Sequence, residues 1–197
     1  DSTMLDSSMR NQLSGIFSGL TNEYIFDIQV SPEHESRKEL LELLNDVASC
    51  SDKITVQVAD GEGLEFSLLK NGEKTGIKFR GVPNGHEFTS LLLAILNSDG
   101  KGKNIPDESI CNRVKALNGP VKLTTYVSLT CTNCPDVVQA LNAMATLNPE
   151  ISHEKADNML PASSFTIRSY RPDRCSVSMF RHLFSIWRGK LRSDVRR

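Results

Sequence analysis

Two cysteines separated by two residues, Cys131 and Cys134, are the side chains of this sequence best placed to do chemistry. A Cys-x-x-Cys pair can hold a metal, close a structural disulfide or exchange electrons with another disulfide. Here an alternating segment, residues 121–129, precedes the pair, and an apolar helical segment, residues 135–147, follows it. Unpaired N–H groups and the helix dipole stabilise a thiolate at a helix N-terminus. This placement therefore favours thiol–disulfide exchange.

In such an exchange the first cysteine, Cys131, is the nucleophile, and Cys134, one turn later, resolves the mixed disulfide. A structural zinc site normally needs four ligands. The remaining candidate ligands form no second paired motif: Cys111, His153, Cys175 and His182. We therefore expect no metal site, and a passive disulfide fits a cytosolic chain poorly. Cys50 and Cys111 lie on predicted helices, where we expect them to pack as small hydrophobic residues.

The elements that must position these cysteines repeat along the chain. Residues 24–97 predict a strand, a helix capped by Ser31, a second strand, a hairpin around Asn71-Gly72 and a covering helix. This is the element order of a thioredoxin-like fold, but it contains only Cys50. A polar linker follows, and the order then begins again. We expect an α/β protein with one thioredoxin-like fold without a dithiol in residues 1–100, and the start of a second, with the cysteine pair, in residues 101–157.

Composition narrows the class of protein. The 197 residues are 39% hydrophobic and 24% charged, as in ordinary globular proteins. No apolar run approaches the roughly 20 residues that span a bilayer, so we expect no membrane segment. The first residues lack a basic start with an apolar core, and the five cysteines do not resemble a secreted disulfide framework. These features predict a cytoplasmic protein.

Two longer blocks carry a family resemblance. "SLTCTNCPDVVQALNAMATLNPEISH", which includes both cysteines, and "GHEFTSLLLAIL" resemble the N-terminal domain of bacterial alkyl hydroperoxide reductase F. The resemblance covers residues 4–157. It implies two fused thioredoxin-like folds that share one sheet, with a dithiol only in the second. It also implies an electron-shuttle role in peroxide detoxification, between a flavoprotein module that uses FAD and NADH and a peroxiredoxin, alkyl hydroperoxide reductase C.

The same resemblance assigns roles to residues. It implies that Cys131 attacks and Cys134 resolves, and that Glu87 matches a family acid near the dithiol. A carboxylate there could relay protons or raise the thiol pKa. The alternative for Glu87 is a first-turn charge that the helix dipole favours. Because the sequence has no G-x-G-x-x-G fingerprint, we expect no cofactor site in this chain, which can be at most the electron-shuttle arm.

The last forty residues depart from the resemblance. Residues 158–197 hold nine Lys and Arg against two Asp, whereas residues 1–157 hold 14 Lys and Arg against 22 Asp and Glu. Residues 158–197 also lack the Val-Pro dipeptide that resembling proteins place before a hairpin in this part of the second fold. We interpret this segment as an atypical basic tail, either a frameshift product or a natural tail for an acidic partner. The second fold should then be incomplete or irregular after residue 157, and the tail should pack poorly.

The sequence thus predicts a disulfide oxidoreductase that passes electrons to a peroxiredoxin. Two alternatives stay open. One is a stand-alone protein disulfide oxidoreductase of the tandem thioredoxin type. The other is a non-catalytic interaction module whose basic tail recruits an acidic partner. Nucleic acid is not an expected partner, and the sequence leaves a homodimer open.

Overall fold

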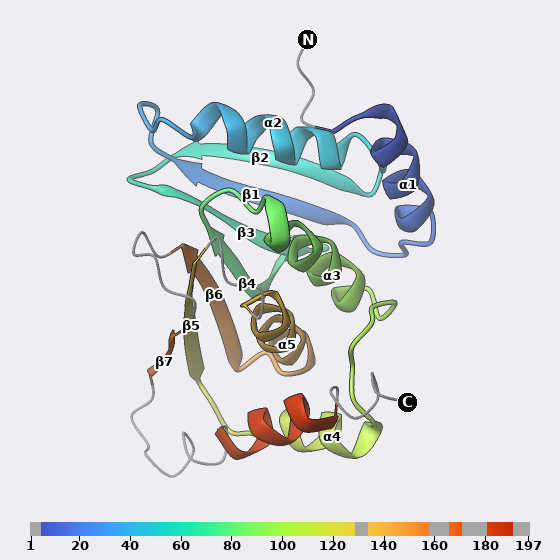
Figure 1. The fold of residues 1–197 in the computed structure, drawn as a ribbon, viewed down its shortest axis with the longest axis vertical. Coiled ribbons are helices and arrows are strands. Elements are labelled where there is room, and N and C mark those ends of the chain that lie inside the picture. Colours follow the sequence, from blue (N-terminus) through green and yellow to red (C-terminus); the bar gives the residue numbers. More distant parts are fainter. Residues whose placement is uncertain (1–4, 129–133, 158–165, 171–180, 191–197) are drawn as a thin grey trace.

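The computed structural model describes residues 5–128, 134–157, 166–170 and 181–190 (Figure 1). Its helices and strands follow the chain in this order: α1 (Ser7–Phe17), β1 (Tyr24–Val30), α2 (Arg37–Ala48), β2 (Ile54–Asp60), β3 (Leu64–Lys70), β4 (Glu73–Arg80), the 3-10 turn η1 (Gly85–Glu87), α3 (Phe88–Ser98), α4 (Glu108–Lys115), β5 (Val121–Val127), α5 (Cys134–Leu147), β6 (Ile151–Asp157) and β7 (Thr166–Tyr170). Residues 181–190 are also helical.

The described strands form one seven-stranded sheet in the order β2-β1-β3-β4-β6-β5-β7. In the first half, β1 pairs in parallel with β2 and antiparallel with β3. In the second half, β5 pairs in the same way with β6 and β7. The register repeats too, since Tyr24 lies opposite Ile54 and Val121 opposite Ile151, thirty residues apart in each case. The prediction of two like folds in one shared sheet is confirmed.

The two halves meet where β4 pairs in parallel with β6, with Ile77 opposite His153 and Phe79 opposite Lys155. Gly76, in β4, lies close to this seam. Its φ is +86°, and an added Cβ would stand 2.8 Å from the carbonyl oxygen of Ile151. Glycine is required there because a side chain would meet both backbone strain and a collision with β6.

The hairpin between β3 and β4 turns at Asn71 and Gly72, whose φ angles are +51° and +83°. Two positive φ values fit the turn that matches the twist of the flanking strands, as the Asn-Gly signal predicted. The start of α2 was predicted wrongly, since the helix begins at Arg37 and not beside Ser31. The N–H of Ser31 instead donates to the carbonyl of Gly63, which keeps Ser31 tied to the sheet.

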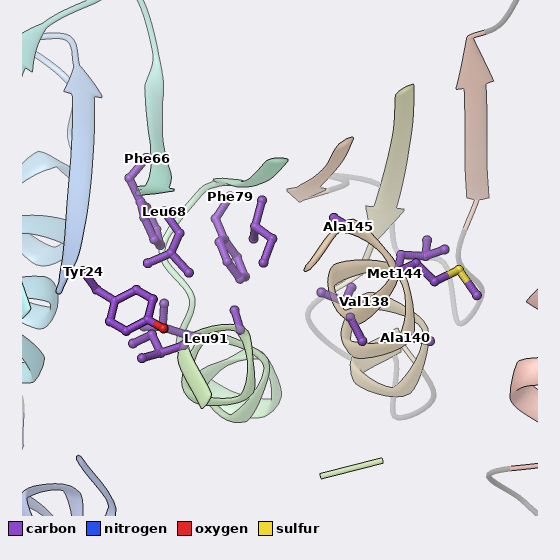
Figure 2. Close-up of a cluster of buried hydrophobic side chains, with 14 of the residues drawn as sticks. Tyr24, Phe66, Leu68, Phe79, Leu91, Val138, Ala140, Met144 and Ala145 are labelled. Carbon is purple, nitrogen blue, oxygen red and sulfur yellow. The ribbon is translucent and has the colours of Figure 1, made fainter. Parts of the chain in front are cut away.

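Alternate residues of the strands point into one core. Figure 2 shows Tyr24, Phe66 and Phe79 gathered over α3, which carries Leu91, with α5 alongside. The Phe66 and Phe79 rings stack at 5.1 Å between centroids. Burial of such rings dominates the stability of a core of this size. No helix among the described residues is long and apolar enough to cross a membrane.

The tail contributes to the fold in two described segments. Strand β7 pairs with β5 in the place that β3 occupies beside β1. In the helical residues 181–190, Leu183 and Trp187 are buried in the core. The expectation of poor packing does not hold for Leu183 and Trp187, which lie four positions apart and therefore share one face of the helix. For the rest of the tail it stays a prediction. Within the described residues, the second half has three strands where the first has four.

Candidate functional site

Cys134 is the first residue of α5, and its side chain is fully buried. It is held in a disulfide, whereas Cys50 and Cys111 are free. Cys131, the predicted nucleophile, lies outside the described residues. The strand before the pair ends at Val127, so the elements on either side of the cysteines are those that the sequence indicated. The roles of the two cysteines stay predictions.

Strands β4, β6 and β5 are parallel neighbours, so their C-terminal ends lie at one edge of the sheet. The segment before Cys134 leaves β5 at this edge, and η1, which carries Glu87, follows the end of β4. Helices α3 and α5 pack side by side behind the edge (Figure 1). Near their starts, the Gln139 Nε2 donates to the Ser90 Oγ at 3.4 Å. The fold thus brings Glu87 and Cys134 to the same end of two touching helices.

Glu87 is only 4% exposed, and its Oε2 has no hydrogen-bond partner in the described structure. Burial raises the pKa of Glu87, because the charged form loses its hydration. The Lys155 ammonium and the Ser90 hydroxyl act in the opposite direction and favour the carboxylate. The surroundings of Glu87 therefore control its protonation, and its action on the dithiol stays a prediction.

A buried cation lies in this region, and it was not among the residues predicted from the sequence. The Lys155 side chain is 0% exposed, and its Nζ donates to Asp157 Oδ1 at 2.8 Å. The same Nζ stands 5.9 Å from the centroid of the Phe79 ring. The Asp157 carboxylate in turn lies over Gly81, where an added Cβ would collide with it. The signal was available, since alternation along β6 points residue 155 inward, where lysine is rare.

His153, one of the residues considered as a spare metal ligand, is engaged otherwise. Its Nδ1 lies 2.7 Å from Asn142 Oδ1, and its Nε2 lies 2.7 Å from Thr125 Oγ1. Complete burial lowers the pKa of His153 to about 3. The ring is therefore neutral and ties β5, β6 and α5 together. Within the described ranges, no group of three or more His, Cys, Asp and Glu side chains is arranged to hold a metal.

The two free cysteines match their expected roles as packing residues. Cys111 is buried, and its Sγ donates to the carbonyl of Pro106 at 3.5 Å. Burial raises the pKa of Cys111, which keeps it a thiol. Cys50 is half-buried, packs against the core, and donates to the carbonyl of Asp46.

Comparison with known proteins decides the family. No protein-family model matches the sequence. The F component of alkyl hydroperoxide reductase from Pseudomonas aeruginosa is 41% identical over 159 residues, which are 80% of this chain. The crystal structure of the N-terminal domain of the same component, AhpF, from Enterococcus faecalis matches with a TM-score of 0.75 and 30% identity, and covers 91% of this chain and 99% of that one. The chain belongs to the alkyl hydroperoxide reductase F family.

Two further comparisons set the limits of this assignment. A Bacillus subtilis protein named NADH dehydrogenase is 40% identical over 155 residues. The chain spans about 30% of the length of this relative and of the Pseudomonas one. A protein disulfide oxidoreductase from Aeropyrum pernix has a TM-score of 0.69 at 16% identity, which shows a shared fold alone. The match therefore concerns an N-terminal domain of two thioredoxin-like folds.

Proposed function

We propose that this chain is a dithiol–disulfide electron shuttle that passes reducing equivalents to a peroxiredoxin, alkyl hydroperoxide reductase C. The observation that carries the proposal is Cys134, a buried, disulfide-bonded cysteine at the start of α5 in a domain of this family. Cys131 is the proposed partner in that disulfide and the proposed nucleophile. A helix N-terminus supports both assignments, because it stabilises a thiolate.

The exchange conserves atoms and electrons in two steps. The Cys131 thiolate attacks one sulfur of the peroxiredoxin disulfide, which forms a mixed disulfide and releases the other sulfur as a thiolate. Cys134 then loses its proton and attacks the Cys131 sulfur. This second step closes the Cys131–Cys134 disulfide and frees the second peroxiredoxin thiolate, which takes up a proton. The peroxiredoxin gains two electrons, and the dithiol of this chain loses them.

Glu87 is the proposed acceptor of the Cys134 proton. Burial disfavours the thiolate, so a buried thiol loses its proton more readily with a base nearby. The raised pKa of Glu87 suits the task, because an acid that titrates nearer to neutral pH both accepts and returns a proton. Its place on η1, which precedes α3 at the end of the α3–α5 pair where α5 begins with Cys134, supports this role.

Electrons must reach the dithiol from elsewhere. In the family this is the task of a flavoprotein module with FAD and NADH, and the longer relatives leave room for one. No glycine fingerprint of such a module occurs in this sequence. The steps proposed for this chain are therefore thiol exchange and proton transfer, and none of them uses a cofactor. A reducing cytoplasm suits a chain with free Cys50 and Cys111.

Alkylation of the reduced protein tests the nucleophile. At pH 7, iodoacetamide should label Cys131 well before Cys50 and Cys111, as followed by mass spectrometry. Equal labelling rates would refute the assignment. A Cys134→Ser variant should then trap a mixed disulfide with an oxidised peroxiredoxin, whereas Cys131→Ser should trap none. Reduction of insulin but not of the peroxiredoxin would instead favour a stand-alone disulfide oxidoreductase.

A further inference from the structure

The two halves of the chain carry opposite charge. Residues 1–100 hold 16 Asp and Glu against 8 Lys and Arg, whereas residues 101–197 hold 8 Asp and Glu against 15 Lys and Arg. The formal net charge of the whole chain is only −1, so two copies do not repel each other at long range. What two copies can do to each other therefore depends on where the two excesses of charge lie.

The two excesses lie at opposite ends of the molecule. Figure 1 shows α2 and β2 at one end of its long axis, and α4 and residues 181–190 at the other. Strands β2 and β7 are the two edges of the seven-stranded sheet, so roughly 29 Å separates them. Salt at physiological ionic strength screens charges beyond about 8 Å. One molecule therefore cannot pair its own two ends, but a second copy can.

The acidic end is built around α2 and β2. Residues 31–63, which contain both elements, hold 8 Asp and Glu against 3 Lys and Arg. Glu33 follows β1, Asp60 ends β2 and Glu62 follows it, and all three side chains are exposed. A backbone hydrogen bond joins the loop after β1 to the turn after β2. We call these three residues the acidic end.

The basic end is built from α4 and the helical residues 181–190. Its four exposed side chains are Arg113, Lys115, Arg181 and His182. The two helical segments are in contact, since Lys190 Nζ lies 3.9 Å from Asp107 Oδ2. The buried Leu183 and Trp187 hold residues 181–190 against the core. The Arg and Lys side chains of the basic end form no ion pair with any residue that the structure describes.

We propose that the basic end of one copy docks on the acidic end of a second copy. The two surfaces differ, so the contact is heterologous, and every copy supplies either side of it. Complementary charge gives such a contact its specificity and makes it sensitive to salt. The proposal does not depend on the thiol chemistry of the dithiol.

Sedimentation velocity of the full chain tests the contact, with dithiothreitol present so that no disulfide links two copies. Dimers or larger species are expected at about 0.02 M salt, and monomers at about 0.5 M. Lys115→Glu should weaken self-association by about tenfold at the lower salt. Lys74→Glu is the matched control, because it changes the net charge equally but lies on the central strand β4. It should change self-association by less than about twofold.

Two double variants separate this contact from simple adhesion of the tail. Lys115→Glu with Arg181→Glu leaves a chain that is acidic at both ends, and Asp60→Lys with Glu62→Lys leaves one that is basic at both ends. Each variant alone should stay monomeric at low salt, and an equimolar mixture should associate.

Three results would overturn the proposal. The first is a parent chain that stays monomeric at low salt. The second is a double variant that associates alone as well as the parent does. The third is binding of poly-glutamate by a chain that stays monomeric, because the occupant of the basic end would then be another acidic molecule.

Discussion

The buried His153 predicts a pH dependence of stability whose size follows from its surroundings. Each ring nitrogen has one partner, and both are satisfied in the neutral ring if Nδ1–H donates to Asn142 and Nε2 accepts from Thr125. A protonated ring would place two donors and a charge in a site with no counter-ion among these partners. The fold therefore holds the pKa of His153 at about 3, against about 6.5 in an unfolded chain.

The sign follows from proton linkage. The unfolded chain binds a proton at this histidine below about pH 6.5, and the folded chain does not until about pH 3. The contribution of the neutral ring is fully present above pH 6.5 and is lost as the pH falls between these values. Integration gives a loss of about 2 to 3 kcal/mol in the free energy of unfolding between pH 7 and pH 4.5. That is a large fraction of the roughly 5–15 kcal/mol that stabilises a domain.

Urea unfolding at pH 7 and pH 4.5, followed by circular dichroism, measures the effect. His153→Gln should lower stability at pH 7 by about 1 to 3 kcal/mol through lost hydrogen bonds. Between pH 7 and pH 4.5, however, the free energy of unfolding of this variant should fall by about 2 to 3 kcal/mol less than that of the parent. Thr125→Val is the control, since it removes one hydrogen bond and keeps the titrating ring. Acidification losses that are equal in the parent and in His153→Gln would refute the reasoning.

Three further substitutions or probes test other parts of the structure. Asp99→Ala should lower the free energy of unfolding by about 3 to 5 kcal/mol, because the buried carboxylate accepts hydrogen bonds from two backbone amides and the Tyr24 hydroxyl; a urea midpoint close to that of the parent would contradict this. Gly76→Ala should cost at least about 1 kcal/mol more than Gly72→Ala, since both have positive φ but only Gly76 faces a backbone oxygen at 2.8 Å; equal costs would argue against a tight seam. Trp187, the only tryptophan, should resist acrylamide quenching in the native chain, and free quenching would show that the tail does not pack as described.

The parts of the fold that sequence could predict are those with local signals. Asn71-Gly72 predicts a hairpin because few residue pairs adopt two positive φ values. The repeated strand and helix order predicts two like folds because each element has its own periodicity. The start of α2 was misplaced, since the bond from Ser31 to Gly63 is a contact between segments far apart in the chain.

The residues around the dithiol show where local signals end. Glu87 was found only through resemblance, and its burial depends on α3 meeting α5. Lys155 was missed because a lysine in a strand is ordinarily read as a solvent-facing residue. The alternation along β6 places residue 155 on the inward face, and the pairing of β4 with β6 completes its burial. The burial of Trp187 was missed because the basic composition of residues 158–197 indicated a poorly packed tail.

The seam between β4 and β6 makes the two halves mutually dependent. A half separated at the linker would expose a whole strand edge, with unpaired backbone groups open to association with other chains. Cleavage of the chain near residue 103 should therefore yield two fragments that associate or aggregate, and not two independently folded domains. The half without a dithiol also cannot be discarded, although it carries no thiol chemistry. Because the two thioredoxin-like halves share one sheet, neither can be moved to another protein as an independent domain. A substitution at the β4–β6 seam therefore affects the stability of both halves.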